Sequence, residues 1–185
     1  VGQGNDAPPP LDVEGLQALV TIDDSNGTIL KKFKYSDGSA EREVAALKQL
    51  HFNVPRLFHY NSTENTILMS KAPGTTVKWA HKQPIEFRLK LIESLAEAFQ
   101  YFWSCGFTHS DIHPDNIMYD GTYLTVIDWG MANTFDQQED ETQLYMLFNY
   151  ILSGQHTDVA RGKYKAPFAK LFKTKDVAAF IASIK

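Results

Sequence analysis

This chain lacks several features that mark particular classes of protein, such as paired cysteines, a membrane span, a signal segment or a strong excess of positive charge. Cys105 is the only cysteine among 185 residues, so the sequence excludes an intramolecular disulfide and favours a reducing compartment. No apolar run is long enough to span a bilayer, and no charged-then-apolar signal segment opens the chain. The net charge of -4 gives no general attraction to nucleic acid or anionic lipid. These absences predict a soluble, cytoplasmic protein that binds neither nucleic acid directly nor a membrane.

What is present indicates one globular domain with an irregular start. A hydrophobic content of 43% and an aromatic content of 12% allow a chain of this length to bury a core. Residues 1–12 differ, because Gly2, Gly4 and three consecutive prolines cannot form a regular helix. We expect residues 1–12 to be disordered or extended. Gly2-Gln3-Gly4 does not predict a phosphate-binding loop, since such a loop follows a strand and no strand precedes these residues.

The most informative feature is a set of polar residues in the second half of the chain. His109 to Asn116 reads His-Ser-Asp-Ile-His-Pro-Asp-Asn, and Asp128-Trp129-Gly130 follows an apolar segment at 124–127. Asp111 in a loop can orient an attacking hydroxyl, while Asn116 and Asp128 can each bind a metal ion. An Asp at a strand end is often only a turn former. The joint spacing favours a site for phosphoryl transfer over that interpretation.

These residues resemble the motifs of the protein-kinase-like superfamily, whose catalytic loop reads His-x-Asp-Leu-x-x-x-Asn and whose metal motif reads Asp-Phe-Gly. The chain is identified as a minimal, atypical member of that superfamily. The resemblance implies an α+β, two-lobed fold. A reduced N-terminal lobe at residues 13–72 would hold a small antiparallel sheet and one helix, and a mainly helical C-terminal lobe would follow at residues 73–185. The resemblance also implies that ATP is bound, with Mg²⁺ or Mn²⁺ held by Asn116 and Asp128.

Two residues of the expected N-terminal lobe match the family's phosphate-binding pair. Residues 15–20 and 28–34 have the pattern of two strands joined by a turn. The second strand resembles the kinase strand whose lysine contacts the ATP phosphates, which makes Lys31 the expected phosphate ligand. The two other lysines of this strand are ordinary edge-strand charges in this interpretation. The helix that follows resembles the one whose glutamate pairs with that lysine, so Glu43 is the expected partner, with Glu41 as the competitor.

The other contacts to the nucleotide are expected from the backbone. Residues 68–74 resemble the hinge between the lobes, where the backbone near Met69 and Ala72 would bind adenine, although Pro73-Gly74 is equally typical of a plain turn. Only Gly15 lies at a suitable distance before Lys31 to represent the family's glycine-rich phosphate loop. The lid over the phosphates is therefore expected to be short or absent, which leaves room for an activating protein partner on this lobe.

Two departures from the family bear on regulation. Regulated protein kinases have an arginine before the catalytic aspartate that receives an activation-loop phosphate, and here this residue is Ser110. Only residues 131–139 separate the metal motif from Asp140 and the next apolar helix, and they contain no Ala-Pro-Glu segment. Both departures predict that activation-loop phosphorylation does not control the protein.

His113 bears on the branch of the superfamily. Protein serine/threonine kinases usually have a lysine here that contacts the transferred phosphate, whereas histidine resembles the aminoglycoside and choline kinases. An alternative role for His113 is a hydrogen bond to the loop backbone. Asp140-Glu141 before an apolar helix instead resembles the RIO-type kinases and the kinase of the KEOPS complex. The sequence does not decide between these branches.

The leading hypothesis is a kinase that uses ATP and Mg²⁺ to phosphorylate a protein Ser or Thr, with Asp111 and His113 as catalytic residues. A small-molecule kinase is the first alternative, but the chain has little length to spare for the helical insertion that encloses such a substrate. A pseudokinase or scaffold that acts by docking is the second, since the phosphate loop and activation segment are reduced. The intact polar positions of the phosphotransfer apparatus favour the enzyme. The oligomeric state is not predicted.

Overall fold

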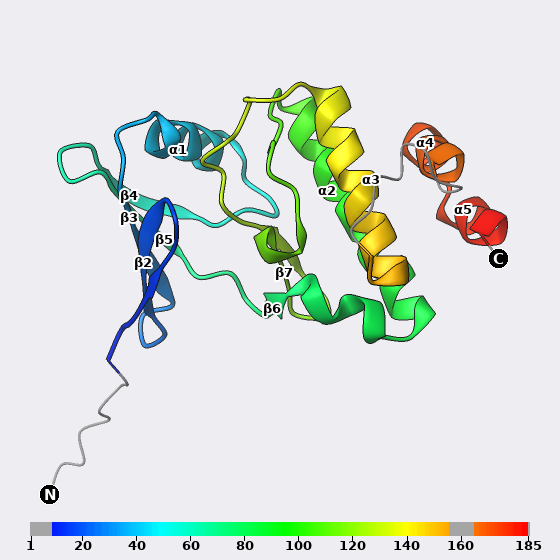
Figure 1. The fold of residues 1–185 in the computed structure, drawn as a ribbon, viewed down its shortest axis with the longest axis horizontal. Helices are drawn as coiled ribbons and strands as arrows, with labels where there is room; N and C mark the ends of the chain where they lie inside the picture. Colours follow the sequence, from blue (N-terminus) through cyan, green and yellow to red (C-terminus); the bar gives the residue numbers. More distant parts are fainter. Residues whose placement is uncertain (1–8, 156–164, 185) are drawn as a thin grey trace, which may run out of the picture.

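The N-terminal lobe is an antiparallel sheet that packs against one helix (Figure 1). The computed structural model describes residues 9–155 and 165–184. The sheet has five strands in the order β1-β2-β3-β5-β4, and each neighbouring pair is antiparallel. Helix α1 (Ser39–Gln49) follows β3 and packs against β4 and β5. The strands are β1 (Leu11–Glu14), β2 (Ala18–Asp23), β3 (Thr28–Phe33), β4 (Leu57–Asn61) and β5 (Thr66–Ser70).

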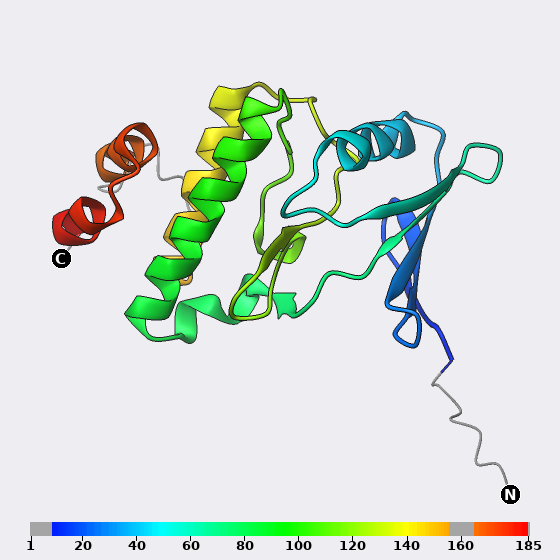
Figure 2. The ribbon, with the colours of Figure 1, turned by 180° about the vertical axis from the view of Figure 1, so that it is seen from behind.

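The C-terminal lobe is built around the long helices α2 (Ile85–Ser104) and α3 (Gln137–Ser153), which pack against each other. A small sheet of order β6-β7-β8 lies beside them. Helices α4 and α5 lie beyond α3, on the side away from the N-terminal lobe, in both views (Figures 1 and 2). The remaining elements are β6 (Thr75–Thr76), η1 (Val77–Lys82), η2 (Pro114–Asn116), β7 (Ile117–Tyr119), β8 (Leu124–Val126), α4 (Lys165–Thr174) and α5 (Val177–Ile184). Among the described residues, no helix is both long and apolar enough to cross a membrane.

The core of this lobe forms because apolar residues recur at helical spacing in α2 and α3. In α2 the side chains of Leu91, Leu95, Phe99 and Phe102 are fully buried, and Phe148 is its buried counterpart in α3. Burying such a side chain contributes about 2 kcal/mol. The chain between the two helices carries residues 109–116, β7, β8 and residues 128–130, so this part of the candidate site is attached at both ends to packed helices.

The α+β, two-lobed architecture expected from the sequence is confirmed, but the first hairpin differs from expectation. Residues 15–20 do not form one strand, because residues 15–17 make the turn between β1 and β2, where the Gly15 N–H donates to the Ala18 oxygen at 2.9 Å. Strand β1 begins at Leu11, so the boundary expected at residue 13 falls inside it. Its four residues, Leu-Asp-Val-Glu, alternate apolar and polar, but the run is short, fully exposed and directly follows three consecutive prolines, so its first half falls within the segment expected to be disordered or extended. Residues 1–8 of the segment expected to be disordered lie outside the described residues.

The hinge between the lobes depends on a glycine. Gly74 has a φ of 88°, and a Cβ atom there would come within 2.2 Å of the Tyr119 main-chain oxygen. Only glycine allows this approach, which places the hinge directly against β7, where Thr75 pairs with Tyr119. Residues 68–74 therefore do more than form a plain turn, since they lead from β5 into the sheet of the other lobe.

Candidate active site

Lys31 joins three elements at the boundary of the two lobes. Its Nζ donates to Oε1 of Glu43 in α1 at 2.7 Å and to Oδ1 of Asp128 at 3.0 Å. Glu43 is only 1% exposed, and its second oxygen, Oε2, accepts the Trp129 N–H at 3.0 Å. A buried carboxylate needs such partners, because an unpaired charge in the interior is costly. The sheet, helix α1 and the metal motif (Asp128-Trp129-Gly130) are thus connected through one ammonium group.

The surroundings of Lys31 keep it charged. Burial alone would lower its pKa, but the adjacent carboxylates of Glu43 and Asp128 outweigh burial and raise the pKa above its ordinary value. A permanently charged ammonium beside a metal motif is suited to binding phosphate oxygens.

The structure separates this pair from the residues that compete with it in the sequence. Lys34 instead pairs with Glu14 of β1 at 2.8 Å. Glu41 is exposed and accepts a hydrogen bond from the Tyr60 hydroxyl at 3.3 Å. Neither competitor contacts the metal motif through these bonds.

The expected metal ligands, Asn116 and Asp128, are brought together by the backbone. The N–H of Ile127, the residue before Asp128, donates to the main-chain oxygen of Asn116 at 2.9 Å. Asn116 Nδ2 donates to the main-chain oxygen of Asp111 at 2.9 Å and to its Oδ2 at 3.2 Å, which fixes the orientation of the amide group. The Asp128 side chain is 48% exposed. An amide oxygen and an accessible carboxylate fit a hard divalent cation such as Mg²⁺.

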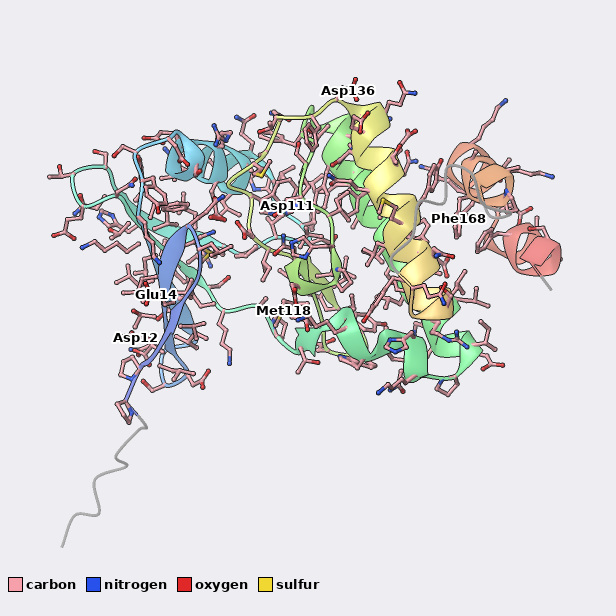
Figure 3. The ribbon with its side chains drawn as sticks, viewed as in Figure 1. Asp12, Glu14, Asp111, Met118, Asp136 and Phe168 are labelled. Atoms are coloured by element: carbon pink, nitrogen blue, oxygen red, sulfur yellow. The ribbon has the colours of Figure 1, made fainter. Side chains whose placement is uncertain are left out.

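Asp111 lies between the two lobes, on the same side of the C-terminal lobe as Met118 of β7 (Figure 3). Its Oδ2 is 3.6 Å from Nε2 of His113, and this contact lowers the pKa of Asp111 and raises the pKa of His113. Asp111 is therefore a carboxylate at neutral pH that can accept a hydrogen bond from a hydroxyl. His113 Nδ1 also accepts the Asp115 N–H at 3.2 Å, so the backbone role considered for His113 exists beside its contact with Asp111.

Asp140, to which sequence analysis assigned no role in the site, holds the catalytic loop (residues 109–116). It is fully buried in the first turn of α3. Its Oδ1 accepts the Ser110 N–H at 2.8 Å, and its Oδ2 accepts the His109 N–H at 3.1 Å and the Trp103 Nε1–H at 2.8 Å. These bonds support Ser110 at a φ of 71°, a conformation that serine rarely adopts. An acidic residue at a helix start usually interacts only with the helix dipole, so no local signal distinguishes Asp140.

Replacing Asp140 with Asn is expected to destabilise the protein. The Asp140 carboxylate accepts hydrogen bonds at both of its oxygens, whereas an Asn side chain has one oxygen and one NH₂ group. At least one buried N–H would therefore lose its acceptor, which costs about 1–3 kcal/mol. For a chain of this size the unfolding midpoint should fall by roughly 2–10 °C, which thermal unfolding followed by circular dichroism measures. Asp136→Asn at the N-cap of the same helix is the matched control, because Asn caps a helix as well as Asp. Equal midpoints for the two variants would show that the Asp140 carboxylate does not anchor the loop.

The segment between the metal motif and α3 is short and is bonded to the catalytic loop. Ser110, where regulated kinases have an arginine, is 1% exposed, and its Oγ accepts the Phe135 N–H at 2.9 Å. Thr108 Oγ1 donates to the Phe135 main-chain oxygen at 2.7 Å, and the Asn133 N–H donates to the Thr108 oxygen at 2.9 Å. Ser110 therefore holds this segment through a hydroxyl and offers no positive charge to a phosphate.

The register of the large sheet puts an apolar surface beside Lys31. Val20 pairs with Lys31, and Ile29 pairs with Met69. Residues two apart in a strand share a face, so all four side chains lie on the same side of the sheet. Ala72, in the hinge that follows, is 5% exposed. An apolar surface between a hinge backbone and a charged lysine is suited to a nucleoside base with attached phosphates.

The lid over this surface is a tight turn rather than a glycine-rich loop. Gly15 is the turn's only glycine, and its N–H already donates to the Ala18 oxygen, so it does not point an amide at a phosphate. Leu16 at the tip of the turn is 92% exposed. The expectation that the phosphate lid is short or absent and the contact of Gly15 with a nucleotide both stay predictions.

A cavity of about 430 Å³ lies beside the catalytic loop. Its lining residues are Lys78 of η1, Tyr150 of α3, and His113, Pro114 and Asp115 of the loop. Lys78 Nζ pairs with Oδ1 of Asp115 at 2.6 Å. Because His113 lines the cavity and also contacts Asp111, the cavity is one side chain away from the candidate catalytic carboxylate.

The fold and these side chains define a two-lobed, kinase-like protein, and comparison with known families agrees. The family model described as protein kinase domain matches residues 28–167, roughly three quarters of the chain. The chain belongs to the protein kinase domain family. The matched range runs from β3, which carries Lys31, through the metal motif and α3 into α4.

A curated viral protein is also similar. "Putative serine/threonine-protein kinase 040L" of Invertebrate iridescent virus 3 is 26% identical over 69 residues, which are 37% of this chain and 19% of the viral protein. The match thus spans about a fifth of that relative's length. Neither comparison distinguishes the RIO-type, KEOPS-type and aminoglycoside or choline kinase branches, so the branch stays a prediction.

Proposed function

We propose that this chain is a protein kinase that uses ATP and Mg²⁺ to phosphorylate serine or threonine hydroxyls of proteins. The observation that carries the proposal is a pair of contact sets, Lys31 with Glu43 and Asp128 and Asn116 with Asp111, which the backbone bond from Ile127 to Asn116 joins. These contacts gather the side chains needed for phosphates, a metal ion and an acceptor between the lobes. The protein kinase family match and the name of the viral relative also support it.

Each residue would act as its surroundings allow. Lys31 would bind phosphate oxygens, and Glu43 would keep its ammonium oriented. Asn116 and Asp128 would hold Mg²⁺, which neutralises phosphate charge when bound. Because these two side chains supply only two oxygen ligands and Mg²⁺ takes six, phosphate oxygens and water would complete the coordination. Asp111 would orient the acceptor hydroxyl and accept its proton late in the transfer.

A protein acceptor is favoured by the open cavity that His113 separates from Asp111. The cavity beside the loop can take a residue next to the phosphorylated one, and its lining includes the exposed Lys78–Asp115 ion pair, with which a polar or charged side chain could interact. His113, between this cavity and Asp111, would donate a hydrogen bond to the transferred phosphate. Between β5 and α2 the described chain has only β6 and η1, so no helical insertion encloses a small molecule there.

Phosphoamino-acid analysis after incubation with γ-labelled ATP and Mg²⁺ tests the acceptor class. The reaction should contain a mixed protein substrate and, in parallel tubes, an aminoglycoside or choline. We expect label on phosphoserine and phosphothreonine, and none on the small molecules. Label on a small molecule alone would contradict a protein acceptor. Bound Mg²⁺·ATP with no transfer to any acceptor or to the protein itself would favour a scaffold over an enzyme.

Activity is expected to be independent of prior phosphorylation. Ser110 offers no cationic receiver, and its hydroxyl already holds the segment at Phe135. Phosphatase-treated protein, with the phosphatase then removed, should therefore transfer phosphate at the initial rate of untreated protein. The initial rates of both samples are compared before and after preincubation with unlabelled ATP. A large loss that preincubation restores would reveal a phosphorylation switch.

A further inference from the structure

Arg42 and Glu43, which are consecutive in α1, bind the backbone of Gly130 and Trp129, which are consecutive in the metal motif. Glu43 Oε2 accepts the Trp129 N–H at 3.0 Å, and Arg42 Nε donates to the Gly130 main-chain oxygen at 2.7 Å. The neighbouring Asp128 side chain is held by Lys31, itself bound to Glu43. Every residue of the motif is thus connected to α1, and Arg42 supplies a contact that the Lys31–Glu43 pair cannot supply.

Arg42 is itself held in place at the start of α1. Its Nη2 lies 3.3 Å from Ser39 Oγ, to which it donates, and Ser39 Oγ in turn donates to Asp37 Oδ1 at 2.6 Å. Asp37 Oδ1 also accepts the Ser39 N–H at 3.0 Å. The half-buried guanidinium therefore has a fixed direction toward Gly130. An arginine used in this way is a rigid donor, because its planar group loses little freedom when it forms each bond.

The far end of the same segment is held as well. Five residues after Gly130, the Phe135 N–H and oxygen are bonded to Ser110 and Thr108 of the preceding loop. Met131 to Phe135 is thus fixed at both ends by side chains of this chain, and none of these bonds requires a phosphate group.

We infer that Arg42 is a positioning residue that keeps the metal motif in place for phosphoryl transfer, a task that a phosphorylated segment performs in regulated enzymes. The expected loss of kcat rests on the proposed function, whereas the expected loosening of the metal motif does not. Without Arg42, Gly130 loses its tie to α1, and Asp128 should occupy its metal-binding position for a smaller fraction of the time. The arginine acts through Asp128 and contacts no reacting atom.

Arg42→Ala, Arg42→Lys and the control Lys48→Ala test this inference. Lys48 is an exposed cation in the last turn of the same helix. Hydrogen exchange of a peptide spanning residues 126–133 is compared with that of a peptide from the core of α2, and kcat and KM for ATP are measured on the same samples. For each variant, exchange is measured at a temperature that lies the same number of degrees below its unfolding midpoint.

In Arg42→Ala we expect exchange of the 126–133 peptide to quicken and kcat to fall, each by roughly ten- to a hundredfold, the range for one charged hydrogen bond. The exchange rate of the α2 peptide and the KM for ATP should each change by less than roughly threefold, which corresponds to less than about 1 kcal/mol. Arg42→Lys should recover part of both losses, because an ammonium can also donate to the Gly130 oxygen. Lys48→Ala should match the original protein.

Equal exchange of the 126–133 peptide in Arg42→Ala and Lys48→Ala would overturn the inference. Faster exchange of the α2 peptide as well would also overturn it, since Arg42 would then support the fold in general. If the original protein transfers no phosphate, the proposed function fails, but the exchange measurement still decides whether Arg42 positions the metal motif.

Discussion

Replacing Asp128 with Asn is expected to abolish Mg²⁺-dependent ATP turnover, with a loss of at least roughly a thousandfold. Asn is nearly isosteric and tolerates the left-handed backbone at residue 128, where φ is 62°, but it brings no negative charge to a metal ion. The fold should survive, because Lys31 keeps its bond to Glu43 and is not left as an unpaired buried charge. ADP release measures turnover, and circular dichroism measures the fold. Asp128→Ala should give the same loss of turnover.

Glu64→Gln is the matched control for this loss of charge. Glu64 is exposed in the turn between β4 and β5, and its backbone N–H donates to Asn61 Oδ1 at 3.1 Å. Its substitution should leave turnover and the unfolding midpoint unchanged. Most of the activity kept by a folded Asp128 variant would show that the carboxylate does not hold the metal ion.

Replacing Asp111 with Asn is expected to separate nucleotide binding from transfer. Asp111 contacts His113 and Asn116, whereas Lys31, the expected phosphate ligand, is bonded to Glu43 and Asp128. The substitution therefore leaves the bonds of Lys31 in place, and the affinity for ATP should be nearly unchanged. Transfer should fall by roughly a hundred- to ten-thousandfold, the usual contribution of a group that orients an acceptor and takes its proton. A fluorescent-nucleotide titration and a turnover assay on the same sample measure both quantities.

Asp120→Asn controls for the substitution itself. Asp120 Oδ1 accepts the Thr122 and Tyr123 N–H groups in the turn between β7 and β8, and an asparagine oxygen can accept the same bonds. This variant should bind and transfer normally. Weaker nucleotide binding by the Asp111 variant, with transfer per bound nucleotide preserved, would move Asp111 from the acceptor side to the nucleotide side.

The sequence could predict those site residues that lie close together along the chain, within one loop and the short hairpin that follows it. A turn and a short hairpin fix Asp111, Asn116 and Asp128 relative to each other, so their order along the chain is enough to find them. The pairing of Lys31 with Glu43 could be proposed because the strand and the helix that carry them resemble the family's phosphate-binding strand and the helix that pairs with it. Only the tertiary structure removed Lys34 and Glu41 from consideration, by giving each a different partner.

Other residues of the site could not be found, because their partners are distant in the sequence. Asp140 binds the Ser110 N–H from 30 residues away, and Arg42 reaches the Gly130 oxygen across 88 residues. In the sequence each of them is an ordinary charge in the first or second turn of a helix. Strand β1 could not be found for a different reason, since its alternation covers only four residues, which are all exposed and directly follow three prolines.

The most direct test of the account is to follow label from ATP with and without Mg²⁺. Purified protein is incubated with a generic protein substrate and either γ-labelled or α-labelled ATP, and a parallel reaction contains EDTA. We predict that label enters protein from γ-labelled ATP only, that EDTA prevents the labelling, and that Asp128→Asn abolishes it. Equal labelling by the original protein and the Asp128 variant, or no labelling by either while the original protein remains folded, would contradict a phosphotransfer site formed by Lys31, Asp111 and Asp128.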